Sequence, residues 1–246
     1  MHVSALYRHP LKGHGREALQ SVTLHVGQSM PFDRRWAVAH DASVADGSAW
    51  VACQNFSRGS KAPALMAIHA KLDDDTGLLT LSHPDRPDLT FDPDQDPAEF
   101  LAWVRPLVPG DRALPARILQ LAKRGFTDTD FASISLCNVA SNAAVAEQAK
   151  VDISPLRWRG NIWFEGAAAW QEFDWIGQEI TLGGATLSIR EPIVRCLATT
   201  ANPETGLRDV DTLGILKSTW KHQNFGIYAE VTKGGLVALG DSLTVH

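Results

Sequence analysis

The chain has 246 residues, of which 44% are hydrophobic and 21% charged, and these proportions are typical of a globular protein. Its formal net charge of −5 argues against a broad basic face and therefore against nucleic-acid binding. No apolar run reaches the roughly 20 residues that cross a bilayer, and the N-terminal sequence lacks an apolar or Arg/Ser-rich targeting pattern. We therefore expect a cytoplasmic protein that has no contact with a membrane.

Short segments of alternating polarity dominate the first half of the chain. Two strands and a hairpin are predicted, at residues 21–27, 34–41 and 65–85. The Pro- and Asp-rich stretch 83–100 is predicted to be a loop because proline does not fit a central strand, and it leads into a short helix that starts at Pro97. Irregular sequence follows to about residue 120, where we place the boundary between two halves.

The second half alternates strands and turns with a few helices. Strands are predicted at 133–137 and 160–166, hairpins at 178–190 and around Gly234-Gly235 with an edge strand after it, and helices at 141–150, capped by Ser141, and at 212–222. Strands joined by hairpins, with few helices, are typical of barrels or strongly curved sheets. The sequence therefore predicts a mainly β (α+β) protein.

The three cysteines are far apart, odd in number and form no CxxC pair, so neither a disulfide framework nor a structural zinc site is expected. A lone cysteine is most often a small core residue, and Cys53 and Cys137 fit that interpretation. Cys196 differs because Arg195 precedes it and a neighbouring cation favours the thiolate. It also follows Pro192, at a predicted strand end where functional groups are often displayed. The residues alone leave both interpretations of Cys196 open.

A catalytic thiol normally needs a base within hydrogen-bond reach. His14 and His222 are the candidates for that role, although no cysteine-hydrolase signature surrounds Cys196. The sequence also lacks the HExxH, P-loop and GxSxG motifs.

The stretch "RWRGNIWFEG" places two arginines on either side of Trp158, just before a predicted strand. Arg157 and Arg159 together with Asn161 could clamp an anion, because arginine presents a planar fork that suits phosphate oxygens. The alternative is a charged turn that has only a structural role.

Several stretches together resemble one family. "LKG" followed by "GQSMPFDRRWAV" is similar to the β-barrel domain that precedes a MOSC domain, and "RWRGNIWFEG" followed by "VRCLATTANPETGLRD" is similar to the MOSC domain itself. The resemblance spans nearly the whole chain. It implies an N-terminal β-barrel-like domain over residues 1–120, packed against a MOSC β-barrel with a few helices over residues 121–246.

The resemblance also implies a molybdenum cofactor, a pyranopterin dithiolene that carries the metal, bound between the two halves. Cys196 would be both the catalytic residue and a thiolate ligand of molybdenum, and a soft sulfur donor suits that metal. The residues implied to bind the cofactor are Lys12, Arg34, Ser135, Asn138, Arg159, Asn161 and Arg195. The chain departs from the family pattern at Gly13-His14, where relatives often have a hydroxyl residue after the lysine, and at Val194, which replaces a more polar residue.

The resemblance implies an oxidoreductase that transfers oxygen atoms and reduces N-hydroxylated small molecules, as amidoxime-reducing components do. Electrons would come from a separate iron–sulfur, flavin or haem protein, because the chain contains no such motif. The alternative function is a carrier, in which Cys196 bears a persulfide or the protein hands over the cofactor without turnover. A β-barrel scaffold with an inert thiol is the third interpretation.

Overall fold

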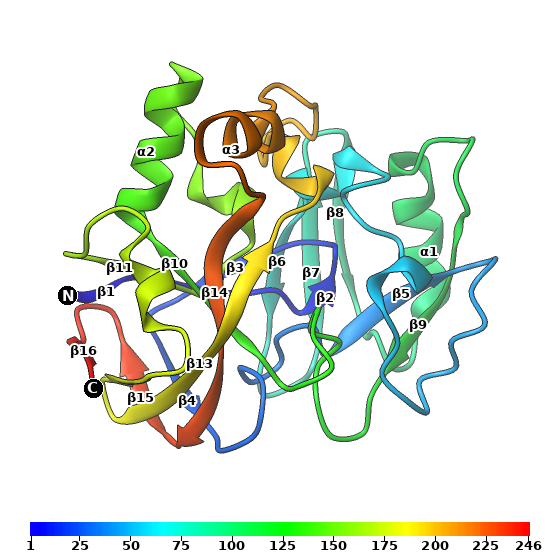
Figure 1. The fold of residues 1–246 in the computed structure, drawn as a ribbon. Coiled ribbons are helices and arrows are strands. Elements are labelled where there is room, and N and C mark those ends of the chain that lie inside the picture. The colour runs from blue at the N-terminus through cyan, green and yellow to red at the C-terminus, as the bar shows by residue number, and fades with distance from the viewer.

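The computed structural model describes residues 1–246, and strands dominate it (Figure 1). The largest element is an eight-stranded sheet in the order β16-β12-β13-β14-β10-β11-β1-β3. Its strands are β1 (His2–Arg8), β3 (Glu17–Leu19), β10 (Ile134–Asn138), β11 (Ile162–Glu165), β12 (Glu179–Leu182), β13 (Ala185–Val194), β14 (Asn224–Lys233) and β16 (Leu243–Val245). The mainly β fold predicted from the sequence is therefore confirmed.

Three smaller sheets complete the strand content. They are β2 (Leu11–Lys12), β5 (Trp36–His40) and β9 (Pro115–Gln120); β6 (His69–Leu72), β7 (Leu79–His83) and β8 (Arg86–Phe91); and the pair β4 (Ser21–Leu24) and β15 (Gly235–Ala238). The helices are α1 (Pro97–Val104), α2 (Val139–Ala149) and α3 (Thr212–Trp220). Short 3-10 turns are η1 (Cys53–Asn55), η2 (Pro63–Ala67), η3 (Arg105–Leu107), η4 (Pro155–Trp158), η5 (Gln171–Trp175) and η6 (Leu197–Thr200). No helix is long and apolar enough to cross a membrane.

Two large apolar cores lie side by side. One, of 20 buried residues, packs on the eight-stranded sheet, and the other, of 17, lies among α1 and the two three-stranded sheets. The sheets do not close into barrels. The large sheet nevertheless curves until β16 comes close to the start of β1, where the Leu243 N–H donates to the Met1 carbonyl at 2.9 Å. Because β1 and β3 belong to this sheet, strand pairing crosses the boundary near residue 120, and the boundary itself stays a prediction.

Three local predictions are wrong. The predicted loop 83–100 contains β8, which tolerates Pro87 because it is the edge strand of its sheet. The sequence considered irregular before residue 120 contains β9, which pairs with β5. The glycines at 234–235 do not close a hairpin, because the chain leaves β14 there and β15 pairs with β4, with Val237 opposite Val22.

Candidate functional site

A pocket of about 300 Å³ is formed by loops and strand ends from both halves of the chain. Six of the eight residues predicted for the site line it: Lys12, Arg34, Ser135, Arg159, Arg195 and Cys196. Asn138 and Asn161 lie outside its lining. The structure thus brings most of the predicted residues together around one cavity, although the role of each stays a prediction.

Cys196 lies at the mouth of this pocket, between the end of β13 and the start of η6, and it is exposed. Its neighbours Val194 and Leu197 are 71% and 51% exposed, so an apolar rim flanks the thiol. Arg208 ties this segment to the other half, because its Nη2 donates to the Ser60 carbonyl at 2.9 Å and its Nη1 to the Leu197 carbonyl. Cys196 is therefore held in place yet accessible.

The other two thiols have different surroundings. Cys137 is fully buried, and burial raises its pKa to about 11, so it fits the predicted role of a core residue. Cys53 was expected in a core too, but it lines the same pocket as Cys196, and its Sγ accepts a hydrogen bond from Arg58 Nη1 at 2.9 Å. The expectation for Cys53 is wrong because η1 turns it toward the cavity.

Arg159 and Arg157 are distinguished by their partners. Arg157 is 3% exposed, and its Nη2 pairs with the Asp209 carboxylate at 2.7 Å while its Nη1 donates to the Thr200 carbonyl at 3.2 Å. Arg159 donates through Nη1 to the Gly15 carbonyl at 3.1 Å, but its buried Nη2 has no acceptor. Burial, together with two nearby arginines, lowers the pKa of Arg159 to about 9. One nitrogen of the Arg159 guanidinium is therefore left without a protein acceptor.

Most of the other pocket cations are committed to protein acceptors. Arg34 Nη2 donates to the Arg159 carbonyl at 3.1 Å, and its Nη1 pairs with the buried Asp33. Arg195 donates to the carbonyls of Phe225 and Trp158 at 2.8 and 2.6 Å, so this guanidinium braces the backbone.

Three titratable residues that the sequence analysis did not single out also line the pocket: Arg58, Asp128 and Tyr228. Asp128 pairs with Lys12, whose Nζ also donates to the Phe126 carbonyl at 2.8 Å. Burial raises the pKa of Tyr228 above its ordinary value. Arg58 could have been found from the basic, glycine-containing stretch "FSRGSK" that follows Cys53. Asp128 and Tyr228 carry no local signal.

The two predicted asparagines have structural contacts. Asn161 is buried, and its Oδ1 accepts from Ser135 Oγ at 2.7 Å while its Nδ2 donates to the Tyr7 carbonyl at 3.2 Å. It therefore joins β1 to the start of β10, behind the pocket wall. Asn138 caps α2 and donates to the buried Glu172 carboxylate at 2.9 Å. The prediction that Ser141 caps this helix is wrong, because its hydroxyl bonds to Glu172 at 2.8 Å.

The histidines considered as bases for Cys196 are elsewhere. His14 is fully buried, with Nδ1 2.8 Å from the Lys12 carbonyl and its ring edge against Phe100, and burial lowers its pKa to about 4. His222 packs against the rings of Trp170 and Phe173. Neither lines the pocket, so the structure does not bring either candidate base to Cys196.

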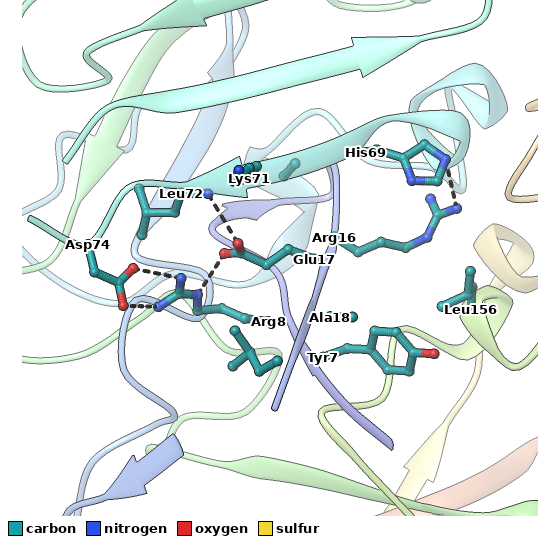
Figure 2. A pocket seen from close by; sticks show the side chains of 12 residues that line it. Tyr7, Arg8, Arg16, Glu17, Ala18, His69, Lys71, Leu72, Asp74 and Leu156 are labelled. Atoms are coloured by element: carbon teal, nitrogen blue, oxygen red, sulfur yellow. Dashed lines mark hydrogen bonds and ion pairs between the residues drawn. The ribbon is translucent and has the colours of Figure 1, made fainter. Parts of the chain in front are cut away.

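A second cavity, of about 730 Å³, lies in the groove between β3 and β6 (Figure 2). Figure 2 shows Arg8 between two carboxylates, and its Nε lies 2.7 Å from Glu17 and its Nη2 2.7 Å from Asp74. The Arg8 guanidinium is thus already paired with both carboxylates. Nowhere do three or more His, Cys, Asp or Glu side chains gather as a metal site.

Comparison with known proteins defines the class. Residues 1–105 match the MOSC N-terminal beta barrel domain, and residues 123–244 match the MOSC domain. The chain therefore belongs to the family in which a MOSC N-terminal domain precedes a MOSC domain. MOSC domains are associated with binding of the molybdenum cofactor.

Individual proteins are more distant. The YuaD protein from Bacillus subtilis is 14% identical, with 99% of this chain and 94% of that chain covered and a TM-score of 0.47. YiiM from Geobacillus stearothermophilus and YiiM from Escherichia coli are 16% and 18% identical, with 46% of this chain and 53% of each of theirs covered and TM-scores of 0.36 and 0.34. These likenesses carry no argument about function. No curated protein matches the chain.

Proposed function

We propose that the chain is a molybdenum-cofactor-dependent oxidoreductase that transfers oxygen atoms and reduces N-hydroxylated small molecules. The observation that supports this most is the convergence of an exposed thiol, Cys196, with Lys12, Arg34 and Arg159 on one pocket. A pyranopterin cofactor presents a phosphate at one end and sulfur ligands for the metal at the other. A pocket with cations and a soft sulfur donor suits both ends.

The residues present fit this cofactor. Arg159 Nη2 is a buried donor without an acceptor, which is costly for a charged group, and a phosphate oxygen would supply the missing acceptor. Lys12 and Arg159 would bind the phosphate, and Asp33 would keep Arg34 oriented beside them. Cys196 would add one thiolate to the two dithiolene sulfurs through which the pterin binds the metal. When bound, the cofactor supplies the redox-active metal that the side chains cannot supply.

The remaining roles follow from access. The open mouth beside Cys196 would admit a small-molecule substrate, and electrons would arrive from a separate iron–sulfur, flavin or haem protein. A second candidate function is a sulfur or cofactor carrier. The exposure of Cys196 supports it, because a thiol at the surface can also meet a donor or acceptor protein.

Elemental and pterin analysis of the purified protein tests the proposal. The enzyme predicts about equimolar molybdenum and pterin, together with reduction of an N-hydroxy compound by a chemical electron donor. Metal-free protein with a labile sulfane sulfur on Cys196 would support the carrier. Protein that contains neither molybdenum and pterin nor sulfane sulfur would support the third interpretation, a scaffold with an inert thiol.

A further inference from the structure

Arg58 is a pocket cation whose charge the protein does not compensate. It is half-buried and lines the same pocket as Cys196. Its guanidinium makes one hydrogen bond, from Nη1 to the Cys53 sulfur at 2.9 Å, and pairs with no carboxylate. Cys53 thus fixes one nitrogen of the fork and leaves the rest without a protein acceptor.

The neighbouring cations show that this is unusual within the pocket. Each has a carbonyl or carboxylate partner: Lys12 has Phe126 and Asp128, Arg34 has Asp33, Arg157 has Asp209, Arg159 has Gly15 and Arg195 has Trp158. The buried nitrogen that Arg159 retains is assigned to the cofactor by the proposed function. Arg58 is thus the pocket cation whose guanidinium has neither a carbonyl nor a carboxylate partner.

Arg58 also lies close to the segment that carries the thiol. A Cβ placed on Gly59 would lie 3.5 Å from the Cβ of Ala198, two residues beyond Cys196. The next carbonyl, of Ser60, accepts the Arg208 hydrogen bond described above. The Arg58 loop, from the first half of the chain, therefore packs directly on the Cys196 segment from the second half.

We propose that Arg58 binds the carboxylate of the substrate, so that the site prefers N-hydroxy compounds that carry a carboxylate. This inference rests on the proposed function. One uncompensated guanidinium matches one negative charge, and its fork can bind both carboxylate oxygens. The exposed side chain of Val194, which lines the pocket, would contact the uncharged body of such a molecule.

Kinetics of Arg58→Gln test the proposal. Two aryl N-hydroxy substrates that differ only in a ring carboxylate or a ring carboxamide are compared, with the cofactor-loaded protein. Loss of a charge-assisted hydrogen bond should raise KM about 10- to 100-fold for the carboxylate and leave the carboxamide unchanged. Lys61→Gln is the matched control, because Lys61 is an exposed cation three residues away that does not line this pocket. Equal KM values for the carboxylate in both variants would overturn the proposal.

A binding measurement without turnover separates the two proposals. Calorimetric titration with benzoate should give a Kd about 10- to 100-fold weaker for Arg58→Gln than for the unsubstituted protein, and benzamide should not discriminate. Arg58-dependent benzoate binding without reductase activity would refute the proposed function and keep the anion site. If Arg58→Gln instead loses molybdenum and pterin during gel filtration, Arg58 belongs to the cofactor site and the inference is wrong.

Discussion

The thiols Cys137 and Cys196 lie on the same sheet region but have opposite access to solvent. Cys137 is a buried residue of β10, where burial keeps it protonated at neutral pH, whereas Cys196 is exposed just after the end of β13. Because a thiol must be accessible to react or to bind a metal, Cys196 is favoured over Cys137 for chemistry.

Cys196→Ser should fold normally and lose molybdenum. The residue is exposed, and substitutions at such positions usually change the free energy of unfolding by less than about 0.5 kcal/mol. A hydroxyl, however, is a poor replacement for a soft thiolate ligand. The measurements are the molybdenum content per chain and the thermal unfolding midpoint. Cys137→Ser serves as the control and should keep its metal; full molybdenum in Cys196→Ser would disprove the ligand assignment.

Arg159→Ala and Arg157→Ala should have different effects. Arg159→Ala removes the Nη2 donor that the fold does not use, together with a single hydrogen bond to the Gly15 carbonyl. Cofactor retention should therefore fall about 10- to 100-fold, while the free energy of unfolding falls by about 1 kcal/mol or less. Arg157→Ala breaks a buried link to Asp209 and the Thr200 carbonyl, so the free energy of unfolding should fall by about 1–3 kcal/mol. Pterin retained after gel filtration and chemical denaturation measure the two quantities. The reverse pattern would mean that the two arginines have exchanged roles.

At the scale of elements, the sequence predicts which segments form helices and strands better than it predicts which strands pair with each other. The prediction of a helix at 212–222 matches α3, because its apolar spacing and its cap at Asp211 are both local signals. The pairing of β15 with β4 joins residues about 200 positions apart, and alternation specifies a strand's face but not its neighbour. The same limit applies to the site. Arg159 and Cys196 are found from motifs, but which of the arginine nitrogens lack an acceptor depends on distant carbonyls.

The link between α2 and η5 predicts a pH dependence of stability. Glu172 is fully buried against the neutral donors Asn138 and Ser141, and burial raises its pKa. The native state therefore binds this proton more tightly than the unfolded chain, whose pKa is near 4.5. Its contribution to stability is present below that value and is lost as pH rises through the native pKa.

Glu172→Gln should remove this dependence. Relative to the unsubstituted protein, the unfolding midpoint of the variant should rise as the pH is increased above the unfolded value of 4.5, because the native carboxyl of the unsubstituted protein then loses its proton. Glu147→Gln, at an exposed position of α2 with no side-chain hydrogen bond, should follow the unsubstituted protein at every pH. Parallel curves for Glu172→Gln would show that the carboxyl does not titrate in this range.

At the scale of the whole molecule, the two apolar cores do not coincide with the two stretches, residues 1–105 and 123–244, that match the family domains. The core beneath the eight-stranded sheet takes Val3, Leu6, Val22, Leu24 and Met30 from the first 30 residues. The N-terminal segment thus completes the core of the MOSC-matching half, whereas the second core, apart from Leu11, comes from residues 36–108. The pocket lies where loops from these two units meet, which is why its cations come from both ends of the sequence.

This arrangement predicts that a fragment of residues 121–246 does not fold alone. It would lose five of the 20 residues in its core, and at about 2 kcal/mol for each buried aliphatic side chain that is roughly 10 kcal/mol. Such a loss equals the whole stability of a typical domain, about 5–15 kcal/mol. Denaturant unfolding followed by circular dichroism should show no cooperative transition for the fragment. Joining residues 1–31 to His246 through a short Gly/Ser linker should restore one, because Leu243 and Met1 are hydrogen-bonded neighbours in the fold. A cooperative transition in the fragment without this addition would show that residues 121–246 fold on their own and that β1 and β4 are not needed for the core.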